Sequence, residues 1–174
     1  TMIVEGTGLS TSDGQDQDYS VKTTTTGTKL LLIPRDIPQS VSVISKQRMA
    51  DQNLTTLRDV LTNTTGINVS RIDSSRTNIY SRGFFVSNYA YEDLPTTISS
   101  IWNFGDAVAD TAIYDSIEVV RGAAGLMSVT GNPSAYVNMV RKHADSKEFK
   151  GDVTAEYGSW DKQRYVLDLQ APLT

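Results

Sequence analysis

Two hydrophobic patterns alternate along the chain, one with the period of a β-strand and one with the period of an α-helix. The strand pattern is clearest near the C-terminus, where Val153, Ala155 and Tyr157 alternate with polar residues. A glycine-containing turn follows at 158–162, and the alternation resumes over 163–170. A period of two on both sides of a turn predicts an antiparallel β-hairpin.

The helical pattern is clearest after residue 53, where apolar side chains recur at the spacing of one helix face: Leu54, Leu57, Val60 and Leu61. Asn53 or Thr55 is the expected N-cap of this helix, because a side-chain oxygen there accepts from the first free N–H groups. Gly66 is placed to end it. A shorter helix is expected after the cap Ser45, and another over 106–112.

Short β-prone runs lie between these helical segments. They cover residues 41–44, 67–71, 78–82, 89–92 and 115–121. Short helices that alternate with strands predict an α+β domain with a mixed sheet, here of four strands. Residues 1–27 show no such periodicity and are rich in Gly, Ser, Thr, Asp and Gln, so we expect a flexible lead there.

The stretch from Ser116 to Lys142 organises the rest of the chain. It begins and ends with apolar runs that predict strands, and a glycine-rich connection without acidic or basic residues joins them. A phosphate-binding loop needs a lysine and a hydroxyl directly after its last glycine, whereas Asn132 and Pro133 follow Gly131. A nucleotide site is therefore not favoured.

The same stretch resembles the plug domain of TonB-dependent outer-membrane receptors. The segments that carry the resemblance are 119–122 (VVRG), 125–127 (GLM), 131–135 (GNPSA) and 137–140 (VNMV). The GNPSA variant is similar to that of the ferric-siderophore branch, especially hydroxamate receptors such as those for ferric coprogen and rhodotorulic acid, and of the ferripyoverdine receptors. Asp93-Leu94-Pro95 departs from the family pattern, because the usual glycine after the aspartate is missing.

The resemblance implies a domain organisation. Residues 1–27 would hold a TonB box and a tether, 28–146 the plug, and 147–174 the first antiparallel hairpin of a transmembrane β-barrel whose remainder lies outside the chain. The implied function is the gate of a bacterial outer-membrane receptor that binds a ferric siderophore and imports it with energy from the TonB complex. The siderophore holds the iron itself, so no protein cofactor or metal site is expected.

The resemblance also assigns roles to individual residues. The arginines of the two Arg-Gly pairs, Arg82 and Arg121, would hold carboxylates on the inner wall of the barrel. The expected siderophore-binding residues, on apical loops, are Arg76, Trp102, Asn103 and Thr130. The TonB box, which would add a strand to the C-terminal domain of TonB, comprises Thr1, Met2, Ile3, Val4 and Glu5.

Composition excludes several other classes. A net charge of −4 disfavours a nucleic-acid surface, and the absence of cysteine excludes a disulfide scaffold. No pair of acids is placed for acid–base catalysis, and His143 is expected to be a solvated strand-end side chain, so the chain is not expected to be an enzyme. The alternative is a soluble periplasmic or secreted binding domain unrelated to transport.

Overall fold

The computed structural model describes residues 36–74, 76–96, 109–122, 133–143 and 148–171. The chain divides into two compact units, residues 1–141 and residues 142–174. Each unit is described by itself. The predicted domain limits at 28–146 and 147–174 stay predictions.

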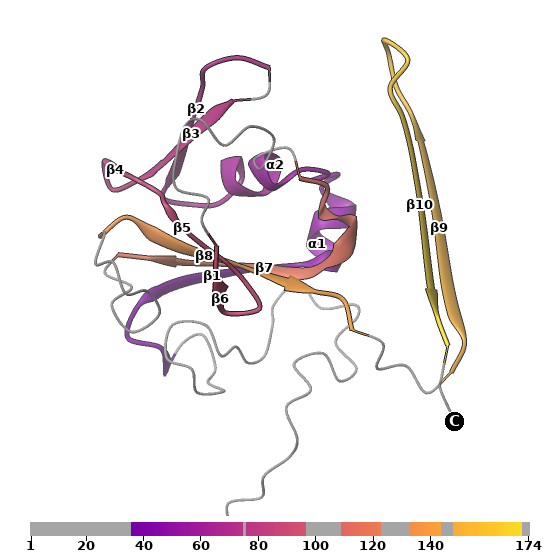
Figure 1. The fold of residues 1–174 in the computed structure, drawn as a ribbon, viewed down its shortest axis with the longest axis horizontal. Coiled ribbons are helices and arrows are strands. Elements are labelled where there is room, and N and C mark those ends of the chain that lie inside the picture. The colour runs from indigo at the N-terminus through magenta and orange to yellow at the C-terminus, as the bar shows by residue number, and fades with distance from the viewer. Residues whose placement is uncertain (1–35, 75, 97–108, 123–132, 144–147, 172–174) are drawn as a thin grey trace, which may run out of the picture. The chain divides into compact units, whose positions relative to one another are not determined.

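The first unit is built on a five-stranded sheet in the order β1-β7-β8-β5-β6 (Figure 1). Its strands are β1 (Ser40–Ser45), β7 (Tyr114–Arg121), β8 (Ala135–Arg141), β5 (Asn88–Tyr91) and β6 (Leu94–Pro95). β5 and β8 run parallel and the other neighbours antiparallel. The predicted mixed sheet is therefore confirmed, and the two-residue β6 extends the four longer strands at one edge.

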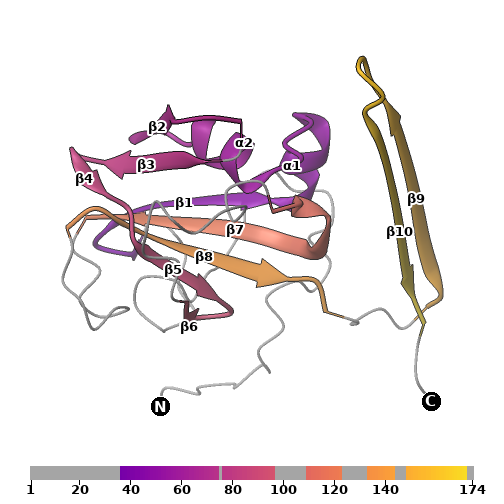
Figure 2. The same ribbon diagram turned by 45° about the horizontal axis from the view of Figure 1, so that its top comes forward.

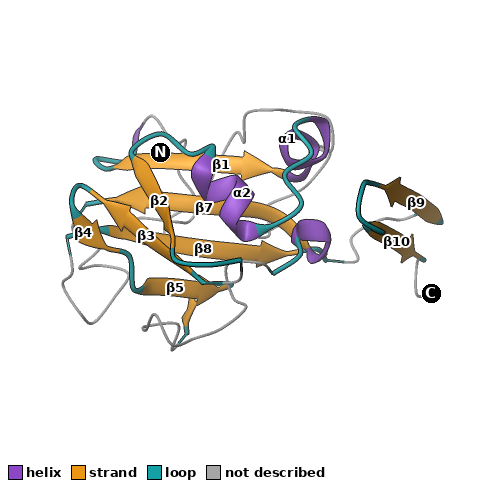
Figure 3. Cartoon of the chain, turned by 90° about the horizontal axis from the view of Figure 1, so that it is seen from above, coloured by secondary structure: helices purple, strands orange, loops and turns teal. Residues whose placement is uncertain are grey.

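A second layer covers one face of this sheet (Figures 2 and 3). It holds the helices α1 (Lys46–Asp51) and α2 (Leu57–Thr62) and a three-stranded antiparallel sheet of β2 (Ile67–Arg71), β3 (Thr77–Ser81) and β4 (Phe84–Phe85). The main hydrophobic core lies between the two layers. Its buried side chains come from both of them and include Ile44, Met49, Leu57, Val60, Leu61, Ile79, Ile117, Val119, Val137 and Met139.

The two α-helices start at hydroxyl side chains. Ser45 caps α1, as the sequence predicts. The cap of α2 is neither Asn53 nor Thr55 but Thr56, because Asp59 three residues later completes a capping box. The Thr56 Oγ1 accepts from the Asp59 N–H at 3.2 Å, and the Thr56 N–H donates to the Asp59 carboxylate at 3.1 Å. A six-residue helix depends strongly on such reciprocal satisfaction of its free N–H groups.

Two further expectations about helices need correction. α2 ends with Asn63 as its C-cap, and Gly66 lies beyond it, where a φ of 79° turns the chain into β2. The predicted helix over 106–112 is partly outside the described residues. Its described end forms a 3₁₀ turn, η3 (Thr111–Ile113), which leads directly into β7.

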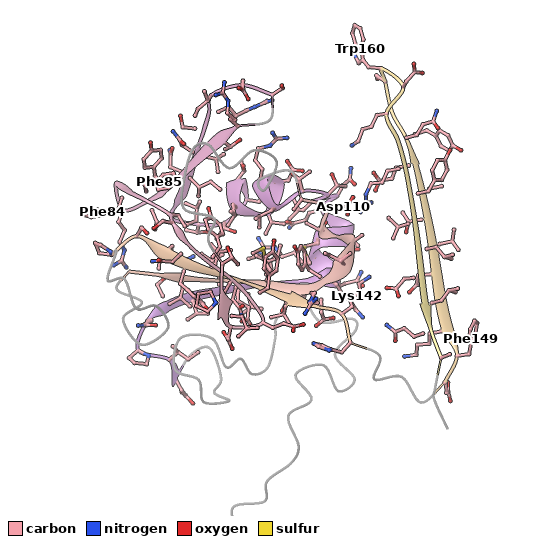
Figure 4. All side chains as sticks on the ribbon, in the orientation of Figure 1. Phe84, Phe85, Asp110, Lys142, Phe149 and Trp160 are labelled. Atoms are coloured by element: carbon pink, nitrogen blue, oxygen red, sulfur yellow. The ribbon has the colours of Figure 1, made fainter. Side chains whose placement is uncertain are left out.

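The second unit contains one antiparallel hairpin of β9 (Lys150–Tyr157) and β10 (Gln163–Gln170), as the alternation predicts. One of its faces carries a ladder of exposed apolar side chains, among them Val153, Tyr157, Tyr165, Leu167 and Leu169. The other face carries the ion pairs Arg164–Glu156 at 2.8 Å and Lys142–Asp168 at 2.6 Å. Figure 4 shows Trp160 at the turn and Phe149 at the open end of the hairpin.

Candidate functional site

Arg82 is presented by a two-residue turn between β3 and β4. Ser81 pairs with Phe84, and the backbone of Arg82 (φ 54°) and Gly83 (φ 84°) is left-handed, which is the geometry of a type I′ hairpin turn. The Arg82 side chain reaches Gly122: its Nη1 lies 2.8 Å from the place where a Cβ would stand on that glycine. Gly122 has a φ of 105°, which favours glycine, and a Cβ at this position would force the Arg82 side chain to move.

Arg121 ends β7 on the face that carries the main core. Its guanidinium donates three hydrogen bonds to two hydroxyls of β1. Nε and Nη2 donate to Ser40 Oγ at 3.1 and 2.9 Å, and Nη1 donates to Ser42 Oγ at 2.9 Å. Its Cδ lies 3.0 Å from the place of a Cβ on Gly66. The structure thus brings together residues from four separate parts of the chain.

The two arginines lie close enough to influence each other. The pKa of Arg121 is lowered, first by burial and then by the positive charge of Arg82. Among the described residues neither guanidinium has an ion-pair partner, and the acceptors of Arg121 are neutral hydroxyls. The planar fork of a guanidinium suits bidentate pairing with an anion that has several oxygens, such as a carboxylate.

The other predicted site residues have different outcomes. Arg76 belongs to a tight turn before β3, where its N–H donates to Asp73 Oδ1 at 2.6 Å and its Nε pairs with the same carboxylate. Its role in binding a siderophore stays a prediction. The remaining predicted siderophore-binding and TonB-binding residues lie outside the described residues: Trp102, Asn103, Thr130, Thr1, Met2, Ile3, Val4 and Glu5.

A buried polar network on the opposite face of the sheet is absent from the sequence-based expectations. The Asn138 Nδ2 donates to Glu118 at 3.1 Å, and the Asn138 Oδ1 accepts from the Asp93 N–H at 2.9 Å. Both Glu118 and Asn138 are buried. Within the described residues the hydroxyl of the buried Tyr136 makes no hydrogen bond of normal geometry, and its pKa is raised by burial and then by the nearby carboxylates of Asp93 and Glu118.

This network fixes a second left-handed turn. Glu92 (φ 50°) and Asp93 (φ 63°) join β5 to β6, again in type I′ geometry. The Glu92 carboxylate accepts from Arg141 Nε and Nη2 at 3.2 and 3.0 Å. The turn that replaces the family's usual glycine is thus held by side chains from β7 and β8. In the sequence, Glu118 and Asn138 alternate with the core residues of β7 and β8. This alternation predicts that both lie on the face of the sheet opposite the main core.

The part of the chain that the structure describes contains neither a candidate metal centre nor a helix suited to cross a membrane. No group of three or more His, Cys, Asp or Glu side chains is placed to hold a metal ion there. Likewise, none of the described helices has the length and apolar character needed to cross a membrane.

Comparison with known proteins places the chain in a family. The model of the TonB-dependent receptor plug domain matches residues 34–135. The ferripyoverdine receptor of Pseudomonas aeruginosa is 41% identical over 175 residues, which cover 100% of this chain and 21% of that receptor. The ferric-pyoverdine 358 receptor of Pseudomonas putida is 40% identical over 172 residues, covering 98% of this chain and 21% of the relative.

Solved structures agree with these sequence matches. The structure of Pseudomonas aeruginosa FpvA bound to heterologous pyoverdines has a TM-score of 0.87 and 40% identity, covering 95% of this chain and 22% of that one. The alcaligin outer-membrane receptor FauA of Bordetella pertussis has a TM-score of 0.83 and 44% identity, covering 93% of this chain and 28% of that one.

These relatives are receptors and not enzymes, and the chain spans about a fifth of the length of the curated relatives it matches. The family model covers both helices, both arginines of the candidate site and every strand of the five-stranded sheet except β8, of which it includes only Ala135. The chain belongs to the family of TonB-dependent receptor plug domains.

Proposed function

We propose that the chain is the plug of an outer-membrane receptor that imports a ferric siderophore with energy from TonB. The observation that carries this proposal is the 41% identity to a ferripyoverdine receptor over the whole chain, tether and hairpin included. Its ligand is a ferric siderophore of the pyoverdine class. A ligand of the hydroxamate type, which the GNPSA variant suggests, is a narrower proposal. The match to an alcaligin receptor does not decide between the pyoverdine class and the hydroxamate type.

Arg82 and Arg121 seat the plug in this account. Arg82 reaches Gly122, the residue after Arg121, and neither guanidinium has a carboxylate partner among the described residues. Carboxylates on the inner barrel wall supply the missing charge, in a poorly hydrated space where bidentate pairing is strong. The hairpin β9–β10 forms the first strands of that barrel, with its apolar ladder toward lipid.

Coupling to TonB begins at the N-terminal segment. Residues Thr1 to Glu5 add a strand to the C-terminal domain of TonB, and residues 6–27 act as the tether. The siderophore binds above the plug through Arg76, Trp102, Asn103 and Thr130. Arg76 is compatible with this role because Asp73 and the backbone of Ile72 hold it in place before any ligand binds.

Uptake of radioactive iron tests the proposal. Cells without their own pyoverdine receptor would express the full-length protein, and ferric pyoverdine and ferric coprogen would be supplied in turn. We expect uptake of ferric pyoverdine that stops when residues 1–5 are deleted. Uptake of ferric coprogen alone would shift the ligand to the hydroxamate class, and no uptake of either would contradict the proposal.

A further inference from the structure

We infer that Ser40 and Ser42 are positioning residues that couple the edge strand β1 to the Arg121 guanidinium, so that separating β1 from β7 frees that guanidinium. The inference rests on the proposed function, because there the coupling protein pulls on the segment that precedes β1. Among the described residues, β1 is the first strand along the chain, and its neighbour in the five-stranded sheet is β7.

Because the serines that hold Arg121 lie in β1, the attachment of β1 controls the position of the Arg121 guanidinium. Ser40 is the first residue of β1 and stands opposite Arg121 in the register. Ser42 lies two residues further on the same face, as the period of a strand requires. Because the ladder bonds run perpendicular to the strands, a load applied from the N-terminal side opens this end of the β1–β7 pair first. The contact with Arg121 is therefore broken before the core is exposed.

The chemistry of the contact allows release. Among the residues that the structure describes, the hydrogen bonds of the Arg121 guanidinium go to the two hydroxyls of β1, at 2.9 to 3.1 Å. Hydroxyls are neutral acceptors, so no buried ion pair resists their departure. Burial first, and the charge of Arg82 second, disfavour the charged Arg121 in its present position and lower its pKa. Once β1 leaves, repulsion and solvation both favour movement of the guanidinium.

This arrangement links two events that the proposed function needs. While β1 is seated, the serines hold Arg121 beside Arg82 as one anion site. When β1 is pulled away, the site loses its geometry and its grip on a bound carboxylate weakens. The plug is thereby loosened through its anchor, with the main core of the first unit still packed.

Thermodynamic coupling of this kind is reciprocal, so removing Arg121 must change the attachment of β1. Hydrogen exchange of the β1 amides in the full-length receptor measures that attachment. We expect the double variant Ser40→Ala/Ser42→Ala to accelerate exchange about tenfold or more, because bonds to a charged group are lost. In an Arg121→Met background the same double variant should change the rate by less than about twofold.

Two controls isolate the hydroxyls. Ser40→Thr/Ser42→Thr keeps both oxygens in a strand-favouring residue and should leave exchange close to the wild-type rate. Val43→Ala weakens β1 from the opposite face, where Val43 stands against Glu118, and should accelerate exchange equally with and without Arg121. If Arg121→Met does not assemble in the membrane, Arg121→Gln, which lacks the guanidinium fork, replaces it.

Equal acceleration by the alanine pair in both arginine backgrounds would overturn the inference, as would threonine variants that behave like alanine. No acceleration at all would also overturn it. Iron uptake by the wild-type receptor is read separately. Loss of the proposed function would therefore appear as absent uptake, and failure of the positioning role as an unchanged exchange cycle.

Discussion

Three left-handed glycines around the arginine pair provide a matched series of substitutions. Gly66, Gly83 and Gly122 have φ values of 79°, 84° and 105°. A Cβ on Gly66 would stand 3.0 Å from Arg121 Cδ, and one on Gly122 would stand 2.8 Å from Arg82 Nη1. A Cβ on Gly83 would have nothing within 4 Å. Alanine at each site therefore adds backbone strain, but at only two of the three would it displace an arginine.

The magnitudes separate the two effects. Left-handed backbone costs an alanine about 1–2 kcal/mol, and each 1.4 kcal/mol is about tenfold in an equilibrium. The contacts at Gly66 and Gly122 are relieved mainly by movement of flexible arginine side chains, so they change position more than stability. We expect all three variants to lower the hydrogen-exchange protection of the plug by about tenfold.

Iron uptake by the full-length receptor should distinguish the variants. Gly66→Ala and Gly122→Ala should lose more uptake than Gly83→Ala, because only they move a guanidinium away from its seat. Arg82→Ala should erase the difference between Gly122→Ala and Gly83→Ala. Equal loss of uptake in all three glycine variants would refute the reasoning, since backbone strain alone would then explain the effect.

Three further substitutions test the packing of the plug within the full-length receptor. Thr56→Ala should lower the free energy of unfolding by about 1 kcal/mol and speed hydrogen exchange of the α2 amides, because the capping box is lost. Thr56→Ser keeps the hydroxyl and should do neither. Equal exchange rates in the two variants would contradict the role of Thr56 as the cap. Leu61→Ala should cost about 2–5 kcal/mol, because Leu61 is fully buried, and a smaller fall in the unfolding midpoint would show that the core collapses around the cavity. Tyr136→Phe should not destabilise, because the hydroxyl makes no hydrogen bond of normal geometry to any residue that the structure describes. Because the pKa of Tyr136 is raised in the folded state, the unfolded state loses this proton first as pH rises. The stability of the wild-type protein should therefore fall above a pH of about 10, and the stability of the Phe variant should fall less. Parallel profiles of stability against pH would contradict this.

Secondary-structure elements that are set by local hydrophobic periodicity could be predicted from the sequence. The period of two identified the hairpin β9–β10, and the run 67–71 matches β2 residue for residue. The predicted caps of α2, Asn53 or Thr55, are wrong: the cap is Thr56, which stands at capping-box spacing from Asp59 in the sequence.

Only part of the candidate site could be predicted from the sequence. The Arg-Gly pairs marked Arg82 and Arg121, but Ser40 and Ser42 precede Arg121 by 81 and 79 residues. Which hydroxyl meets a guanidinium depends on strand order and register, and both are set by the packing of the whole sheet. The same reason hides the network of Glu118, Asn138 and Asp93, since each of these residues is ordinary within its own segment.

The most direct test of the central claim is titration of the full-length, siderophore-loaded receptor with the purified C-terminal domain of TonB. The account predicts binding that disappears when residues 1–6 are deleted and that persists in a receptor with an intact N-terminus but with Trp102 replaced. Binding that is unaffected by the deletion would contradict the assignment of the N-terminal segment. Absence of binding in the intact receptor would contradict the account of the chain as a TonB-driven gate.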